Sequence, residues 1–249
     1  MFNYGGFQGP EILLDKNVVY VNFNYRLGPL GFLSTEDDVV PGNNGLKDQI
    51  VALKFIREHI KHFGGNTNSI TLAGNSAGGA SVHFHCLIKK SRGQYLGKVA
   101  AVVDTWSRDP LLPMHPYELL KKKMVYDIPW LVSHVGSEGL YPAAGAAHGD
   151  DASYILNMSL NTQSDENDRK MSDILVNIWL SFAEMGFREP EVCNVNWTQV
   201  SKSSKQTDYL KISSPNDLEM EANSNMGHVQ FWNSLPINEN EKLLQENDW

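Results

Sequence analysis

The chain has 249 residues, of which 41% are hydrophobic and 20% charged, so it can bury one substantial core and we expect a single domain over residues 1–249. Its formal net charge of −8 argues against nucleic-acid binding, and its apolar runs are too short for a membrane-spanning helix. Residues 1–6 lack the charged start and apolar centre of a signal peptide, and two cysteines do not make a disulfide framework, so the compartment stays unknown.

The first predicted elements are a buried strand and a long helix. Residues 18–23 are β-branched and aromatic and are followed by Gly28-Pro29, which predicts a strand that ends there. From Asn44 onward the apolar residues recur at helical spacing as far as Ile60. Gly64-Gly65 then predict the end of the helix.

The most specific motif follows a predicted strand at residues 70–73. Gly74-Asn75-Ser76-Ala77-Gly78 is a G-x-S-x-G pentapeptide, and the small and apolar residues after it predict a helix. Strand, sharp turn and helix in this order are typical of the nucleophile elbow of an α/β-hydrolase, in which the turn exposes the serine hydroxyl. Ser76 is therefore the candidate nucleophile.

Strands and helices continue to alternate after the elbow. Residues 98–104 and 128–135 are further candidate strands, and this alternation predicts an α/β fold with a mainly parallel sheet flanked by helices. An apolar stripe over residues 171–182 predicts a core-facing helix that ends around Gly186. Residues 190–249 are polar and rich in Ser and Asn, and we expect an irregular C-terminal part packed on the same domain.

A serine hydroxyl becomes a good nucleophile when a histidine, itself oriented by a carboxylate, takes its proton. His83 and His85 are near Ser76 in sequence, but they stand about 10 to 13 Å away along the same helix. They cannot reach the hydroxyl. In α/β-hydrolases the order along the chain is serine, acid, histidine, so the partners of Ser76 must follow it.

This order leaves two candidates for each partner. Glu138 follows the strand at residues 128–135, and Asp104 closes the strand before it, so both remain open as the acid. After Glu138 only His148 and His228 remain. His148 lies in a loop of small residues, whereas His228 lies in the polar tail, which favours His148.

Several stretches around these residues resemble the type-B carboxylesterase/lipase family, which includes the cholinesterase-like enzymes. The matching stretches are residues 24–28, 31–35, 41–49, 63–66 and the elbow itself. The sequence of residues 74–85 is most similar to that of insect carboxylesterases that act on juvenile hormone, pheromones or odorants. The resemblance implies an α/β-hydrolase fold, a small-molecule ester as substrate, and no metal or organic cofactor.

The resemblance also implies the roles of the site residues. The family's Asp/Ser-Glu-Gly motif, matched by Ser137-Glu138-Gly139, makes Glu138 the triad acid, and its His-Gly step, matched by His148-Gly149, makes His148 the triad histidine. The oxyanion hole would use the backbone N–H of Ala77. Gly5 and Gly6, a remnant of the family's glycine-rich motif, would supply the other donors.

Compared with the family, three stretches are missing: the N-terminal part, a segment near residues 93–98 and a segment between residues 142 and 145. Glu138 and His148 are only ten positions apart. Two hypotheses remain open. The chain is a serine carboxylesterase that works through an acyl-enzyme, or it is a catalytically impaired or inactive remnant that binds apolar ligands or a protein partner. Full-length relatives are expected to be secreted, and the sequence does not indicate the oligomeric state.

Overall fold

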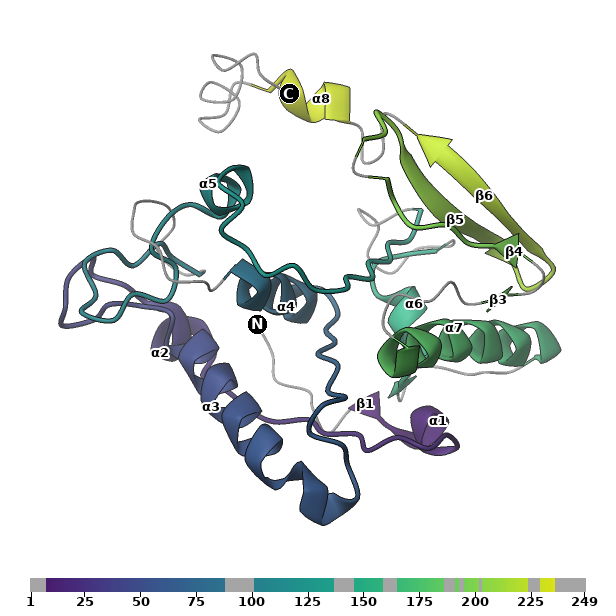
Figure 1. Ribbon diagram of the computed structural model, residues 1–249, viewed down its shortest axis with the longest axis horizontal. Helices are drawn as coiled ribbons and strands as arrows, with labels where there is room; N and C mark the ends of the chain where they lie inside the picture. The colour runs from purple at the N-terminus through teal and green to yellow at the C-terminus, as the bar shows by residue number, and fades with distance from the viewer. Residues whose placement is uncertain are drawn as a thin grey trace. The chain divides into compact units, whose positions relative to one another are not determined.

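A computed structural model of the chain describes residues 8–87, 101–136, 146–158, 165–185, 191–192, 195–201, 203–223 and 229–235 (Figure 1). The chain divides into two compact units, Met1–Phe187 and Arg188–Trp249. All the described candidate site residues lie in the first unit. That the two units make up one domain stays a prediction.

The first unit is mainly helical in its described residues. Its helices are α1 (Glu11–Leu14), α2 (Gly28–Phe32), α3 (Asn44–His59), the 3₁₀ helix η1 (Ile60–Phe63), α4 (Ala77–Leu87), α5 (Pro116–Lys121), α6 (Asp150–Ser153) and α7 (Glu166–Met185). Two short strands, β1 (Gln8–Gly9) and β2 (Asn157–Met158), pair antiparallel.

The three long helices confirm the helical predictions. Helix α3 starts at Asn44 as expected, and its 3₁₀ extension stops at Gly64, whose φ of 81° is readily adopted by glycine. Helix α4 begins directly after Ser76. Helix α7 covers the predicted apolar stripe and buries Ile174 and Ile178.

The predicted parallel sheet is not confirmed within the described residues, because every sheet there is a two-stranded antiparallel pair. Residues 18–23, 70–73, 101–104 and 128–135, where strands were predicted, are neither helical nor paired in a ladder. A strand forms only where its N–H and C=O groups meet a neighbouring strand, and propensity alone does not supply that neighbour.

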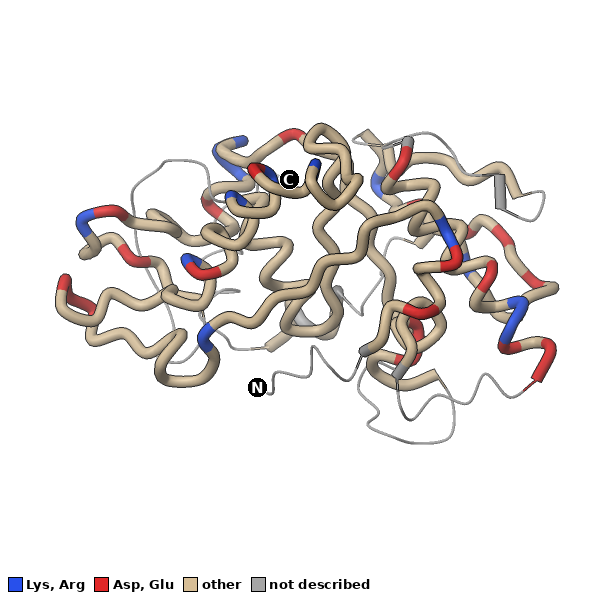
Figure 2. Tube along the Cα trace, turned by 90° about the horizontal axis from the view of Figure 1, so that it is seen from below, with Lys and Arg blue, Asp and Glu red and all other residues tan. Residues whose placement is uncertain are grey.

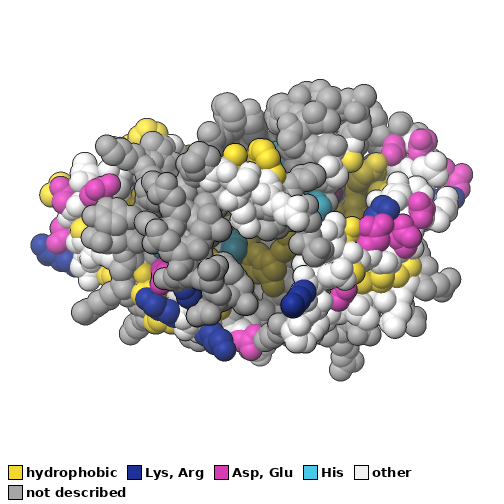
Figure 3. All heavy atoms as spheres, turned by 90° about the horizontal axis from the view of Figure 1, so that it is seen from above, with side chains coloured by type: hydrophobic (Ala, Val, Ile, Leu, Met, Phe, Trp, Pro, Cys, Tyr) yellow, Lys and Arg dark blue, Asp and Glu magenta, His cyan; other side chains and the backbone are white. Residues whose placement is uncertain are grey.

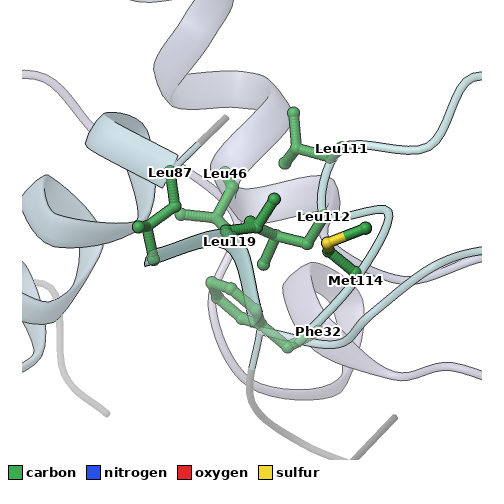
Figure 4. Close-up of a cluster of buried hydrophobic side chains, with 7 residues drawn as sticks. All are labelled: Phe32, Leu46, Leu87, Leu111, Leu112, Met114 and Leu119. Atoms are coloured by element: carbon green, nitrogen blue, oxygen red, sulfur yellow. The ribbon is translucent and has the colours of Figure 1, made fainter. Parts of the chain in front are cut away.

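A cluster of buried side chains fixes the end of α4 that is remote from Ser76. It contains Phe32, Leu46, Leu87, Leu111, Leu112, Met114 and Leu119 (Figure 4). Gly45 makes this packing possible, because a Cβ there would lie 2.6 Å from the ring of Phe32. The core thus joins α2, α3, α4 and α5 and holds the helix that presents the candidate nucleophile.

The second unit contains β3 (Glu191–Val192), β4 (Val195–Asn196), β5 (Thr207–Ser214), β6 (Asp217–Asn223) and α8 (Val229–Asn233). Strands β5 and β6 form an antiparallel hairpin, although an irregular part was predicted here. The connecting residues Pro215 and Asn216 are typical turn formers, a signal that the sequence prediction did not weigh. Across the hairpin, Lys211 Nζ lies 2.6 Å from Glu221 Oε1.

Charges are mixed along the described trace, with Lys and Arg scattered among Asp and Glu (Figure 2). No helix in the described part of the chain is long and apolar enough to cross a membrane.

Candidate active site

The elbow is a tight turn with Ser76 at its centre. Ser76 has a φ of 55°, in the left-handed region that costs a non-glycine residue about 1–3 kcal/mol. The turn is closed by hydrogen bonds from Gly78 N to Asn75 O, 2.8 Å, and from Ala80 N to Ser76 O, 3.0 Å. A Cβ at Gly74 would lie 2.3 Å from the carbonyl carbon of Gly78, so only glycine fits at this position.

The structure brings His148 onto the hydroxyl of Ser76. Nε2 of His148 lies 2.8 Å from Oγ of Ser76, although 72 residues separate the two in the chain. This distance is that of a normal hydrogen bond, in which the hydroxyl donates when the proton of the neutral imidazole is on Nδ1. Both residues are exposed, so a ligand can reach them from solvent.

His148 is held by the turn that starts α6. Ala147 N donates to Asp150 Oδ2 at 2.7 Å, and Asp150 N donates to Ala147 O at 3.1 Å. Gly149 completes the turn with a φ of 86°, and a Cβ built there would be 3.6 Å from Asn75 Oδ1. The histidine turn therefore lies against the elbow itself.

The segment that leads toward Glu138 runs along α4. Tyr126 N donates to Cys86 O at 3.1 Å near the C-terminal end of the helix, and the rings of Trp130 and His83 are 5.3 Å apart further along. Ser133 Oγ then donates to Asp151 Oδ2 in α6, at 2.7 Å. The segment thus passes from the far end of α4 toward the end that carries Ser76.

Of the two acid candidates, Asp104 is engaged elsewhere. Its side chain is fully buried, and its carboxylate accepts hydrogen bonds from the backbone N–H groups of Leu111, 3.0 Å, and Leu112, 2.7 Å. It therefore stabilises the loop that supplies the core. Glu138 lies outside the described residues, as does the alternative histidine His228.

The two histidines on α4 also have structural contacts. His85 Nε2 lies 2.7 Å from Oε1 of the buried Gln49 on α3, and burial lowers the pKa of His85. His83 contacts Trp130, as described above. Their contacts agree with the prediction that neither reaches Ser76.

Of the oxyanion-hole candidates, only Ala77 is described. Since it is the first residue of α4, its backbone N–H has no acceptor inside the helix and can bind a ligand oxygen. Gly5 and Gly6 lie outside the described residues. No group of three or more His, Cys, Asp and Glu that could hold a metal ion occurs among the residues that the structure describes.

Sequence reasoning missed the contact between Ser133 and Asp151. The two are 18 residues apart, and no local pattern pairs a serine in a strand-like segment with one aspartate of an acidic pair. Sequence reasoning also missed the contact between Gln49 and His85, because in the sequence Gln49 looks like any other polar residue of a helix.

A serine in a left-handed turn at the start of a helix, with a histidine on its hydroxyl, is the local arrangement that α/β-hydrolases use for acyl transfer. The comparison with known families agrees with this class. The profile of the carboxylesterase family matches residues 2–101 and 133–232, which include Ser76 and His148. The chain belongs to the carboxylesterase family.

Several similar proteins come from insects. A carboxylic ester hydrolase of Bombus ignitus is 24% identical over an alignment that covers 98% of this chain and 76% of the relative. Juvenile hormone esterase of Tribolium castaneum is 51% identical over 43% of this chain and 19% of its own length. Esterase FE4 of Myzus persicae is 56% identical over 38% of this chain and 17% of its own length. These relatives place the chain among carboxylic ester hydrolases of the insect type.

The alignment with the Bombus ignitus relative runs over 421 positions, whereas this chain has 249 residues. At least 172 of those positions (421 minus 249) therefore have no counterpart here. The relative is much longer between the matched ends of this chain, which supports the expected internal gaps.

Proposed function

We propose that the protein is a serine carboxylesterase in which Ser76 is the nucleophile, His148 the general base and Glu138 the carboxylate that orients His148. The observation that carries this proposal is the 2.8 Å contact between His148 Nε2 and Ser76 Oγ. Among the described residues, Ser76 is the one serine whose backbone is in the left-handed region, and the histidine that contacts its hydroxyl is 72 positions away in the chain. A nucleophilic serine and its general base must lie within hydrogen-bond distance of each other, as these two do.

In the acylation step, Ser76 Oγ attacks the carbonyl carbon of the ester and its proton moves to His148 Nε2. The negative charge that develops on the carbonyl oxygen is stabilised by the N–H of Ala77, with Gly5 and Gly6 as further donors. His148 then gives the proton to the alkoxide, the bond from the carbonyl carbon to the alcohol oxygen breaks, and the alcohol leaves.

In the deacylation step, water attacks the acyl-enzyme while His148 accepts its proton. The tetrahedral intermediate collapses, His148 returns the proton to Ser76 Oγ, and the carboxylic acid leaves. The chemistry needs no metal or organic cofactor.

Two observations support Glu138 rather than Asp104 as the acid. Both carboxylate oxygens of Asp104 are already used by backbone donors. The segment that precedes Glu138 follows α4 toward its Ser76 end and contacts the helix that starts next to His148. Five extended residues after Ser133 can span at most about 18 Å, so the length of the chain does not forbid contact between Glu138 and the imidazole.

We also propose that the complete fold is that of an α/β-hydrolase with a mainly parallel sheet and that both compact units belong to one domain. Membership of the carboxylesterase family implies the α/β-hydrolase fold. The apolar runs at residues 18–23 and 70–73 are the strands that such a sheet would use, the second of them leading into the elbow.

The substrate class is a small carboxylic ester. Relatives are named carboxylic ester hydrolase and juvenile hormone esterase, and the exposed position of Ser76 leaves room for an ester to approach. Exposure has a cost as well, because water screens the charges that stabilise the transition state. Covalent labelling of Ser76 is therefore a more direct test than turnover.

The test is reaction of the folded chain with a fluorophosphonate probe, with the adduct located by mass spectrometry. We expect labelling at Ser76 in the wild type, none in Ser76→Ala, and a loss of at least about a hundredfold in the labelling rate of His148→Ala and Glu138→Gln. Asp104→Asn is the matched acid control: its folded fraction should label at the wild-type rate.

The outcomes separate the alternatives. If the wild type folds cooperatively but does not label, the esterase proposal is wrong and a binding remnant of the family is left. If Asp104→Asn stays folded and does not label while Glu138→Gln does, the acid has been misassigned.

A further inference from the structure

The hydrogen bond between Ser133 and Asp151 links two segments that the proposed site needs in register. Ser133 lies five residues before Glu138, and Asp151 lies three residues after His148. Ser133 Oγ donates to Asp151 Oδ2 at 2.7 Å. The bond therefore spans the same short stretch of chain that carries the proposed acid and base.

Asp151 lies where its hydrogen bonds can fix the position of the turn that carries His148. Its second oxygen, Oδ1, accepts from Ala152 N at 2.9 Å, so the carboxylate is held at both ends. Asp150, the preceding residue, closes the turn on Ala147. The two aspartates thus have separate roles, since Asp150 shapes the histidine turn and Asp151 attaches that turn to another segment.

The segment on the other side is itself held against α4. Tyr126 N bonds to Cys86 O, and Trp130 lies against His83, so the segment is fixed at two points before it reaches Ser133. Helix α4 starts next to Ser76. The chain of contacts therefore runs from the helix of the nucleophile, through residues 126–133, to the turn of His148.

This link matters because the chain lacks at least 172 positions of its relative's alignment. A catalytic triad needs its members within about half an ångström of the productive geometry, and misplacement by 1 Å can cost about a hundredfold in rate. Contacts between the segments that carry the site then matter more for holding this geometry.

We propose that Ser133 and Asp151 form a clip that positions His148 against Ser76. Both are positioning residues, since neither touches the reacting atoms. The inference rests on the proposed function for its effect on rate, but the clip itself can be tested without any activity.

The first experiment measures the rate of fluorophosphonate labelling in Ser133→Ala, Asp151→Ala and the double variant. Each single change should lower the rate about 10- to 100-fold, and the double variant should be no slower than the slower single variant, because both remove one bond. Ser133→Thr keeps the hydroxyl and should retain most of the rate. Thr35→Ala removes a similar exposed bond, from Thr35 Oγ1 to Asp37 Oδ1 at 2.6 Å, and should label at the wild-type rate.

The second experiment is amide hydrogen exchange in the peptide that covers residues 146–156. Ser133→Ala should speed exchange there, whereas Thr35→Ala should not. Unchanged exchange in Ser133→Ala overturns the clip, whatever the activity. Faster exchange with an unchanged labelling rate shows that the bond holds the turn but does not position the base, and the positioning role is then wrong.

The two proposals can fail separately. Absence of labelling in the folded wild type overturns the proposed function and with it the effect on rate. Wild-type labelling at Ser76 that is equally fast in Ser133→Ala overturns only the clip.

Discussion

Ser76 shows how single residues shape the candidate site. Its left-handed backbone places the hydroxyl at the outside of a turn, and the turn closes only because Gly74 has no side chain to meet Gly78. Gly149 serves the histidine turn in another way, because its φ of 86° is one that glycine adopts without strain. Both glycines stand in motifs that the sequence singled out, so the local geometry of these turns could be predicted from the residues alone.

His85 couples stability to pH. Burial lowers the pKa of His85 below the ordinary value of 6.5, so the unfolded chain binds this proton more readily than the folded chain. The free energy of unfolding is therefore fully retained above about pH 6.5 and falls as the pH falls from there toward the lower, folded-state pKa.

We expect His85→Gln, which does not titrate, to weaken this dependence while it keeps a polar group near Gln49. Denaturant unfolding at about pH 7.5 and pH 5.5 measures it. His62→Gln, a change at an exposed position, is the control and should leave the dependence unchanged. An equal loss of stability on acidification in His85→Gln and the wild type would refute the assignment to His85.

At the scale of elements, α4 is fixed at both ends. Its N-terminal end carries the elbow, and its C-terminal end is packed into the cluster of Figure 4 through Leu87. Helix α5 covers the same cluster with Leu119, whose side chain is fully buried. Helix packing therefore determines where the elbow lies, although the elbow's own shape is local.

The contribution of α5 to the hydrophobic core can be tested by comparing two neighbouring leucines. Leu119 is 0% exposed and Leu120 is 46% exposed. Leu119→Ala should lower the free energy of unfolding by about 2–5 kcal/mol, because it leaves a cavity among the clustered side chains. Leu120→Ala should change it by no more than about 0.5 kcal/mol. Denaturant unfolding compares the two, and equal losses would show that the cluster is not the core of this unit.

Elements predicted from periodicity were more reliable than those predicted from composition. The helices α3 and α7 appear where apolar spacing and a following glycine predicted them, because the pattern of a helix is contained within a few turns of chain. Residues 18–23 and 70–73 were predicted as strands but are not paired in a ladder, since a strand depends on a partner that is remote in sequence.

At the scale of the whole molecule, the residues that the structure describes expose many large apolar side chains. Figure 3 shows hydrophobic side chains at the surface on the face that it presents. On α3, Val51 is 66% exposed and Phe55 is 61% exposed, one turn apart on the same side of the helix. Neighbouring apolar side chains of this kind favour association.

We therefore expect Phe55→Gln to reduce concentration-dependent association, measured by sedimentation velocity over a dilution series. The free energy of unfolding should change by no more than about 0.5 kcal/mol, because little apolar area is buried there. Lys54→Gln, at an exposed position on the same helix, is the control and should not reduce association. A loss of about 2 kcal/mol or more in Phe55→Gln would contradict the prediction, since it would mean that the ring is covered in the folded protein.

The sequence by itself determined the family resemblance, the long helices and the elbow with Ser76, because each is written in a few consecutive residues whose backbone preferences act locally. Tertiary structure alone decided that Asp104 serves a loop, that Gln49 meets His85 and that Ser133 is bonded to Asp151. These contacts join residues 7 to 36 positions apart, and they form only when packing brings separate segments together. The contact between Ser76 and His148 depends on both sequence and tertiary structure. Sequence motifs identified the two residues, and the fold of the first unit brings Nε2 and Oγ to within 2.8 Å.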